Sequence, residues 1–248
     1  MHIHCILGTT GVGKTAVATA QARRLSAPVL VLDRIQIHGD LAISSGRPDA
    51  AEVEGTERRY LAERPLCDGE MTPEEGLYLL YAQLARLRQR PAVVLEGGSC
   101  SIIRLLTAHG FLSLAHVTVE WRTIPDLYSY RERVSRRVTA MFAAGMVDEI
   151  CDAATDPAAY ANLQTTVGPN ALLAWAERAG RTLADLRHAA ADHAERANLI
   201  HLVVQSHVRY ANQQEACWQT IRNEIAAPTV ATPARPLLAQ VPFVVAAS

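Results

Sequence analysis

The residues Gly8 to Thr15 read G-T-T-G-V-G-K-T, which fits the phosphate-binding pattern G-x-x-x-x-G-K-[ST]. In such a loop the glycines let backbone N–H groups converge on phosphate oxygens, Lys14 adds positive charge, and the Thr15 hydroxyl can bind Mg²⁺. Lys14 is the only lysine of the chain, because arginine fills every other basic position. The pattern predicts a phosphate site, and it fits ATP hydrolysis, kinase chemistry and diphosphate displacement equally.

Two carboxylates follow apolar runs that we interpret as buried strands. Asp33 comes directly after residues 28–32, and Glu96 follows residues 92–95. In a parallel sheet, ligands bind outside the carboxyl ends of the strands, so both side chains should lie near the phosphate loop. Asp33 could act as a general base or cap a turn. Glu96 could reach Mg²⁺ through water or belong to the turn at Gly97-Gly98.

A predicted helix carries Arg131, Arg133, Arg136 and Arg137. Arg133 and Arg137 are four residues apart and therefore share one face of that helix. Two guanidinium groups on one face suit a phosphate through bidentate hydrogen bonds. The alternative is a solvated charged face paired with Glu132.

The elements that must position these residues follow from the apolar pattern. Apolar runs predict strands at 1–7, 28–32, 92–95 and 116–121, and helical spacing predicts helices at 16–25 and 72–90. Strands that alternate with helices indicate a parallel sheet. The predicted fold class is therefore α/β, a P-loop parallel sheet flanked by helices, with a mainly helical C-terminal lobe.

The domain organisation follows from where the alternation stops. We expect a P-loop α/β core at 1–124 and a helical lobe at 125–225 that completes the substrate cleft, with breaks near Pro157 and at Gly168-Pro169. Residues 226–248 are rich in Ala, Pro and Val and contain no acidic residue. This composition is compatible with a mobile tail.

Composition limits the partners. Lys and Arg total 24 against 25 Asp and Glu, a net charge of −1, so we expect no stable nucleic-acid complex. The 5 cysteines form no C-x-x-C pair, which indicates reduced thiols in a cytoplasm. No apolar run reaches the roughly 20 residues of a membrane helix, and the first residues do not resemble a secretory leader. We expect no membrane partner, and the sequence leaves the oligomeric state unknown.

Several motifs, in order over the first 142 residues, resemble those of the bacterial adenylate dimethylallyltransferases, also called isopentenyltransferases. The matching segments are 8–15, 32–36 (L-D-R-I-Q), 45–48 (S-G-R-P), 59–61 (R-Y-L), 64–66 (R-P-L), 95–99 (L-E-G-G-S) and 137–142 (R-V-x-x-M-F). The D-R-I-Q and S-G-R-P combination is far more specific than the phosphate loop.

The resemblance implies that the loop binds dimethylallyl diphosphate, that the exocyclic amine of AMP attacks the allylic carbon, and that diphosphate leaves, with Mg²⁺ as cofactor, in cytokinin biosynthesis. It assigns catalysis to Asp33 as base, Thr10 near the reacting centre and Arg137 on the leaving group. It assigns the donor diphosphate to Gly11, Gly13, Lys14, Thr15, Arg137, His207 and Tyr210, and the metal to Thr15. It assigns the acceptor to Arg34, Ser45, Gly46, Arg47, Ser99 and Arg133.

The C-terminal half departs from the best-known members. Tyr210 stands where they carry a histidine, and His207 where they carry a tyrosine. The acidic residue that helps them accept a hydroxylated donor is absent around Val167-Gly168. We expect a preference for the plain dimethylallyl donor, because a hydroxyl that enters beside Val167 loses its hydrogen bonds to water.

Three other functions share parts of this pattern. A small-molecule or nucleotide kinase shares the loop, the sheet and an arginine-bearing lid. A related transferase that modifies adenosine in tRNA uses similar chemistry, although the short chain and the net charge argue against it. A sensor of a phosphorylated ligand needs no base, so Asp33 favours an enzyme. ADP, ATP or another amine stays open as the acceptor.

Overall fold

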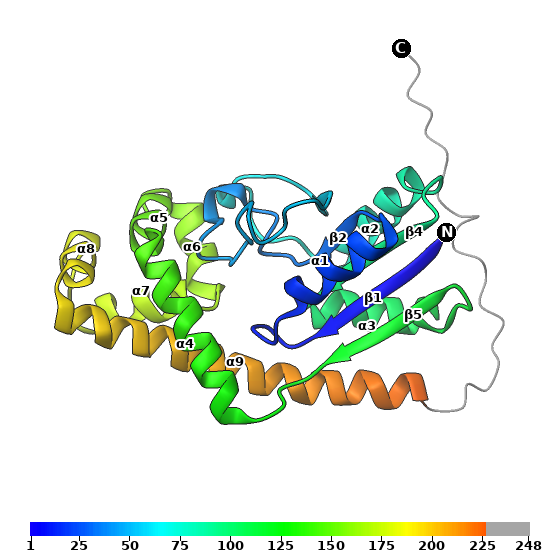
Figure 1. Ribbon diagram of the computed structural model, residues 1–248. Helices are drawn as coiled ribbons and strands as arrows, with labels where there is room; N and C mark the ends of the chain where they lie inside the picture. Colours follow the sequence, from blue (N-terminus) through cyan, green and yellow to red (C-terminus); the bar gives the residue numbers. More distant parts are fainter. Residues whose placement is uncertain (227–248) are drawn as a thin grey trace, which may run out of the picture.

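The computed structural model describes residues 1–226 (Figure 1). Its five strands are β1 (His2–Gly8), β2 (Val29–Leu32), β3 (Arg58–Tyr60), β4 (Ala92–Gly97) and β5 (Val117–Arg122). They form one sheet in the order β3-β2-β4-β1-β5, and every neighbouring pair is parallel. The predicted parallel sheet is confirmed. β3 was not predicted.

Helices cover both faces of the sheet. Successive residues of a strand point to opposite faces, and the central strands β2 and β4 are apolar at nearly every position, so both faces must be buried. On one face, Ala18 and Ala22 of α1 (Lys14–Leu25) pack against Val29, Val31 and Val94. On the other face lie α2 (Pro73–Arg86) and α3 (Cys100–Ala108). α2 begins at a Thr72 cap followed by Pro73, a favourable helix start.

The helical lobe follows β5 and consists of α4 (Leu127–Ala143), α5 (Met146–Ala153), α6 (Pro157–Thr165), α7 (Pro169–Arg178), α8 (Leu183–Ala191) and α9 (His193–Ala226). α6 and α7 begin at Pro157 and Pro169, so both predicted breaks are confirmed. Short 3₁₀ turns lie at Gly39–Leu41, Leu66–Asp68 and Phe111–Ser113. The predicted fold class is confirmed.

The long helix α9 joins the two halves of the molecule, and Figure 1 shows it running along both. Leu199 and Val203 are buried with α4 in the core of the lobe. Further along, Trp218 and Ile221 are buried in the core beneath the sheet. The division at residues 124 and 225 stays a prediction, and of the predicted tail only Ala226 belongs to the described residues. None of the described helices is long and apolar enough to cross a membrane.

Candidate active site

The phosphate loop connects β1 to α1 at the carboxyl end of the sheet. Gly8 must be glycine, because a Cβ there would lie 1.9 Å from the Arg122 carbonyl oxygen and φ is +145°. Lys14 Nζ donates to the Thr9 carbonyl at 2.7 Å. Burial lowers the pKa of Lys14 to about 8, against the opposite effect of the nearby Glu96 carboxylate. The loop therefore holds its one lysine where an anion would compensate for lost solvation.

Residues of α9 and α4 fix this loop from the other side. Thr10 N donates to Gln214 Oε1 at 2.8 Å, and Gln214 Nε2 donates to the Gly98 carbonyl at 2.8 Å. Thr9 Oγ1 donates to Glu215 Oε1 at 2.5 Å, and Tyr130 OH donates to the Thr10 carbonyl at 3.1 Å. The helical lobe thus determines the shape of the phosphate loop.

Asp33 occupies the turn after β2 and faces the cleft beside the loop. Its Oδ1 accepts hydrogen bonds from the backbone N–H groups of Ile35 and Gln36 at 2.8 and 3.1 Å. Oδ2 makes no hydrogen bond with the described residues. One oxygen therefore caps the turn, and the other is free to accept a proton.

Glu96 is the penultimate residue of β4 and is buried, with its side chain reaching Thr15 in the first turn of α1. Its Oε1 accepts a hydrogen bond from Thr15 Oγ1 at 2.7 Å, and its Oε2 pairs with Arg58 Nη2 at 2.7 Å. Because the Thr15 hydroxyl donates its proton to Glu96, the lone pairs of Oγ1 stay available for a cation.

A cleft of about 920 Å³ joins these groups to the arginine face of α4. Of the predicted residues, its lining includes Thr10, Gly11, Gly13, Lys14, Thr15, Asp33, Ser45, Gly46, Arg47, Arg133 and Arg137. The structure therefore brings eleven of the predicted site residues to one cavity. Their individual roles stay predictions.

The S-G-R-P segment closes one side of the cleft. Arg137 Nη2 donates to the Gly46 carbonyl at 2.7 Å. A Cβ on Gly46 would lie 2.1 Å from that nitrogen, and φ there is +66°, so this position requires glycine. Arg133 approaches Gly13 from the same face of α4, with Nη1 3.9 Å from the position of a Cβ there. Both guanidinium groups thus lie over the phosphate loop.

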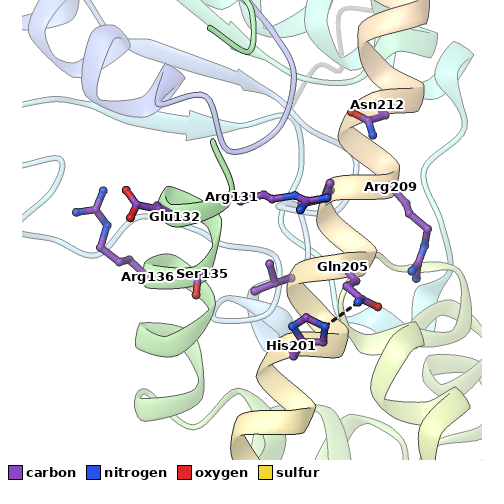
Figure 2. A pocket seen from close by; sticks show the side chains of 10 residues that line it. Arg131, Glu132, Ser135, Arg136, His201, Gln205, Arg209 and Asn212 are labelled. Atoms are coloured by element: carbon purple, nitrogen blue, oxygen red, sulfur yellow. Dashed lines mark hydrogen bonds between the residues drawn. The ribbon is translucent and has the colours of Figure 1, made fainter. Parts of the chain in front are cut away.

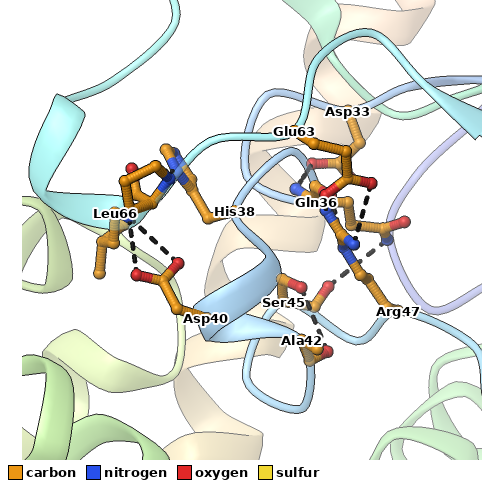
Figure 3. Close-up of polar contacts among 10 residues, drawn as sticks. Asp33, Gln36, His38, Asp40, Ala42, Ser45, Arg47, Glu63 and Leu66 are labelled. Carbon is orange, nitrogen blue, oxygen red and sulfur yellow. Dashed lines mark hydrogen bonds and ion pairs between the residues drawn. The ribbon is translucent and has the colours of Figure 1, made fainter.

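Arg47 of the same segment is tied to the protein. Its Nε donates to the Gln36 carbonyl at 2.6 Å, and its guanidinium pairs with Glu63 at 2.9 Å (Figure 3). It also stacks on the Tyr60 ring, 3.9 Å from the centroid. Ser45 Oγ donates to the Ala42 carbonyl at 3.2 Å. These contacts fix the side of the cleft opposite the phosphate loop.

Besides His207, which lies in a separate small hollow, three predicted residues do not line the cleft. Arg34 turns away and donates to the Met71 carbonyl at 2.8 Å, and Ser99 Oγ lies 3.3 Å from Ser101 Oγ. Tyr210 lies on α9, where burial and then the Asp33 carboxylate raise the pKa of its phenol to about 12. The roles predicted for these three residues stay predictions.

His207 lies in a small hollow of about 30 Å³ that also contains Thr10, Gly46 and Arg137. Its Nε2 is buried and has no hydrogen-bond partner among the described residues. Burial, reinforced by the Arg137 charge, lowers the pKa of His207 to about 4. The imidazole is therefore neutral near pH 7.

Sequence reasoning missed four residues of the site, Arg58, Tyr130, Gln214 and Glu215. Gln214 and Glu215 are more than 200 residues from the loop they bind. Nothing local in the sequence links them to it. A weak signal exists in Gln214, a polar residue between the buried apolar positions Ala211 and Trp218 on one face of α9.

A second hollow, of about 810 Å³, lies between α4 and α9 (Figure 2). Its charged and polar lining is Arg131, Glu132, Ser135, Arg136, His201, Gln205, Arg209 and Asn212, over Val204 and Val208. We call it the α4–α9 groove. Arg136 lines both this groove and the cleft.

Fold and site together define an α/β protein in which a P-loop and arginines of the helical lobe line one cleft. A family model described as isopentenyl transferase matches residues 1–227, so the chain belongs to the isopentenyl transferase family. The resemblance found in the sequence is confirmed.

Relatives and solved structures agree with this family. An adenylate dimethylallyltransferase of Allorhizobium ampelinum is 40% identical over 121 residues, 48% of this chain and 51% of that protein. This match spans about half the length of that relative. One from Ralstonia solanacearum is 30% identical over 222 residues, 87% of this chain and 92% of that protein.

Solved structures show the same fold at low sequence identity. A tRNA isopentenylpyrophosphate transferase from Bacillus halodurans aligns with a TM-score of 0.63 at 15% identity, covering 88% of this chain and 86% of that one. A tRNA Δ(2)-isopentenylpyrophosphate transferase from Staphylococcus epidermidis aligns with a TM-score of 0.63 at 14% identity, covering 88% and 89%.

Proposed function

We propose that this protein transfers a dimethylallyl group from dimethylallyl diphosphate to the exocyclic amine of AMP and releases diphosphate. The observation that carries the proposal is the free Oδ2 of Asp33, which faces the cleft that also contains Lys14 and Arg137. Relatives named adenylate dimethylallyltransferase support the choice of substrates.

The donor diphosphate fits the phosphate loop. Lys14 and Arg137 supply positive charge where the leaving group becomes more negative as the carbon–oxygen bond breaks. Gly11 and Gly13 line the cleft and have no side chain that would keep phosphate oxygens away from the backbone N–H groups. Stabilisation that grows toward the transition state accelerates the step, whereas equal binding of the ground state does not.

Mg²⁺ fits beside the diphosphate, with Thr15 Oγ1 as its protein ligand. No group of three or more His, Cys, Asp and Glu residues in the described part of the chain could hold a metal alone. A hard cation that takes its other ligands from diphosphate oxygens and water suits such a site. The ion would neutralise charge on the diphosphate.

The acceptor amine reacts at the opposite side of the donor carbon. Its nitrogen forms a bond to the allylic carbon while the electron pair of the carbon–oxygen bond passes to diphosphate. The amine proton then moves to Asp33 Oδ2. The two hydrogen bonds to Oδ1 hold the carboxylate in place for this transfer. We place the nucleotide phosphate near Arg133, on the face of α4 that lies over Gly13.

Product analysis tests the proposal. Purified protein is incubated with Mg²⁺ and dimethylallyl diphosphate plus AMP, ADP, ATP or tRNA, with ATP alone as a further sample, and products are identified by mass spectrometry. We expect prenylated AMP as the main product. A prenyl adduct only on tRNA would move the acceptor to nucleic acid, and ATP consumption without an adduct would indicate a kinase.

We also propose that the protein prefers dimethylallyl diphosphate to its hydroxylated analogue as the prenyl donor. Val167 precedes Gly168, whose Cβ position lies 3.3 Å from His207 Nε2. An apolar side chain there offers no partner to a donor hydroxyl. Competition between the two donors in one reaction, followed by mass spectrometry, tests this preference, and equal amounts of both products would contradict it.

A further inference from the structure

A buried arginine lies behind the proposed metal site. Arg58 begins β3 at the edge of the sheet, and Glu96 lies one residue before the end of β4, with β2 between the two strands. Arg58 pairs in register with Val29, and Glu96 with Val31. The arginine therefore crosses β2, a span of about 10 Å for two strand spacings, to reach the carboxylate.

The ion pair between Arg58 and Glu96 is close and is shielded from solvent. Arg58 Nη2 lies 2.7 Å from Glu96 Oε2, and each side chain is only 6% exposed. The contact is an ion pair without hydrogen-bond geometry, and none of the three guanidinium nitrogens of Arg58 has a hydrogen-bond acceptor among the described residues. The charge of this guanidinium is therefore directed at Glu96.

Glu96 also contacts the end of the phosphate loop, at Thr15. Its other oxygen, Oε1, accepts the proton of Thr15 Oγ1 at 2.7 Å. Oε1 is hydrogen-bonded to Thr15 and Oε2 is paired with the charge of Arg58. The Thr15 hydroxyl therefore donates toward Glu96, and its lone pairs point away from that carboxylate. If Glu96 were free to rotate, Thr15 could turn its proton toward the cation site.

We propose that Arg58 is a positioning residue for Mg²⁺. It fixes Glu96, and Glu96 orients Thr15 so that the hydroxyl oxygen can ligate the ion that accompanies the diphosphate. Arg58 does not line the cleft and touches no substrate. The inference rests on the proposed function only in taking Mg²⁺ and diphosphate as the ligands.

A buried ion pair by itself contributes little to stability compared with apolar residues of similar size. A purely structural role for Arg58 therefore predicts a change in melting temperature alone. The positioning role also predicts a change in how tightly the site binds the cation, because residues that orient a metal ligand affect metal affinity by about 10- to 100-fold.

The test compares Arg58→Met and Arg58→Lys with Arg59→Met. Arg59 is the neighbouring arginine of β3, and it pairs at the surface with Glu57. Calorimetry measures the binding of inorganic diphosphate with and without Mg²⁺, and kinetics measure the Mg²⁺ concentration for half-maximal rate. We expect Arg58→Met to weaken Mg²⁺-dependent diphosphate binding about 10-fold, with Mg²⁺-free binding changed less than about 3-fold.

The Mg²⁺-dependent affinity of Arg58→Lys for diphosphate should lie between the affinities of Arg58→Met and the unmodified protein. The affinity of Arg59→Met should equal that of the unmodified protein. Unchanged Mg²⁺ dependence in folded Arg58→Met would overturn the proposal. If that variant does not fold, Arg58→Met/Glu96→Gln removes both buried charges and replaces it. A folded double variant that binds Mg²⁺ and diphosphate like the unmodified protein would also overturn the proposal.

The binding readout separates this proposal from the proposed function. Inorganic diphosphate and Mg²⁺ can bind whether or not any acceptor is prenylated. If the unmodified protein binds them but forms no prenylated nucleotide, the transferase assignment fails while the role of Arg58 is still decided by the variants.

Discussion

The cleft and the α4–α9 groove lie on two sides of the same helix and have similar volumes, about 920 and 810 Å³. Both are lined by arginines of α4. The cleft has Arg133 and Arg137, the groove has Arg131, and Arg136 reaches both. Size and positive charge therefore do not distinguish them.

What differs is the wall opposite the arginines. In the cleft this wall is the phosphate loop with Lys14 and the half-buried carboxylate of Asp33. In the groove it is α9, which presents Val204 and Val208 together with His201, Gln205, Asn212 and a further arginine, Arg209, but no carboxylate (Figure 2). The two hollows therefore differ in what faces the arginines of α4, and the proposed function depends on the backbone donors and the carboxylate that only the cleft places opposite them.

Among the variants that compare the cleft with the groove, Lys14→Met has the largest expected effect, because it removes the only lysine from the cleft. We expect kcat/KM to fall about 10³-fold, because a charge that stabilises the leaving group in a water-poor site is worth several kcal/mol. Steady-state kinetics with dimethylallyl diphosphate check this. A loss below tenfold would mean that the loop does not hold the reacting diphosphate.

A matched pair of arginine variants tests the comparison directly. Arg137→Met should lower kcat/KM about 10²-fold, since the proposed function places Arg137 at the leaving group. Arg209→Met, in the groove, should change it less than about 2-fold, as expected for an exposed side chain away from the site. Similar losses in both variants would make the groove part of the reaction site.

Removing the anchor between α9 and the loop should cost stability. Gln214→Leu leaves the Thr10 N–H and the Gly98 carbonyl without their partner. Unpaired buried groups cost about 1–3 kcal/mol each, so we expect a lower free energy of unfolding and a higher KM for the donor. Urea unfolding measures the first effect. Gln205→Leu, in the groove, is the matched control.

His207 should make the protein less stable in acid. Its pKa is lowered to about 4 in the folded protein, whereas the unfolded value is about 6.5. The unfolded chain therefore binds the proton first, and stability falls as the pH drops from about 6.5 to 4 and then levels off, by up to about 3 kcal/mol. Urea unfolding at several pH values should show this slope, which His207→Gln should reduce.

The smallest expected effect is a proton uptake by Lys14 when diphosphate binds, which should be measurable only above neutral pH. Because its pKa is lowered to about 8, part of the free protein carries a neutral amine at pH 8.5. Diphosphate binding favours the charged amine, so binding should take up a fraction of a proton at this pH and almost none at pH 6.5. Calorimetry in buffers of different ionisation enthalpy measures the uptake. No difference between the two pH values would contradict this placement of Lys14.

The parts of the molecule with a local sequence pattern were predictable. The phosphate loop, Asp33 after its strand and the breaks at Pro157 and Pro169 each depend on neighbouring residues, and the structure contains all of them. β3 was missed because Arg-Arg-Tyr lacks an apolar alternation and pairs with a single neighbour, β2. A short edge strand gives little signal of its own.

Contacts between distant segments were not predictable. Arg34 is adjacent to Asp33 in sequence, yet the turn after β2 directs its side chain to the Met71 carbonyl. Gln214 and Arg58 have no local feature that marks them for the site, because their partners come from other elements. Local patterns predicted the phosphate loop, Asp33 and the arginines of α4, and the family resemblance added Thr10 and the S-G-R-P segment. The residues that hold the cleft in shape became visible only in the fold.

The central claim is that the free Oδ2 of Asp33 accepts the proton of the attacking amine. Single-turnover formation of prenylated AMP tests this claim most directly. Asp33→Asn keeps an oxygen to accept the hydrogen bonds from Ile35 and Gln36 but cannot take the amine proton. We predict a rate lower by about 10²- to 10⁴-fold, the range for general-base catalysis, with unchanged binding of AMP and inorganic diphosphate. A rate within about 3-fold of the unmodified protein, or a loss explained by weaker binding, would contradict the account.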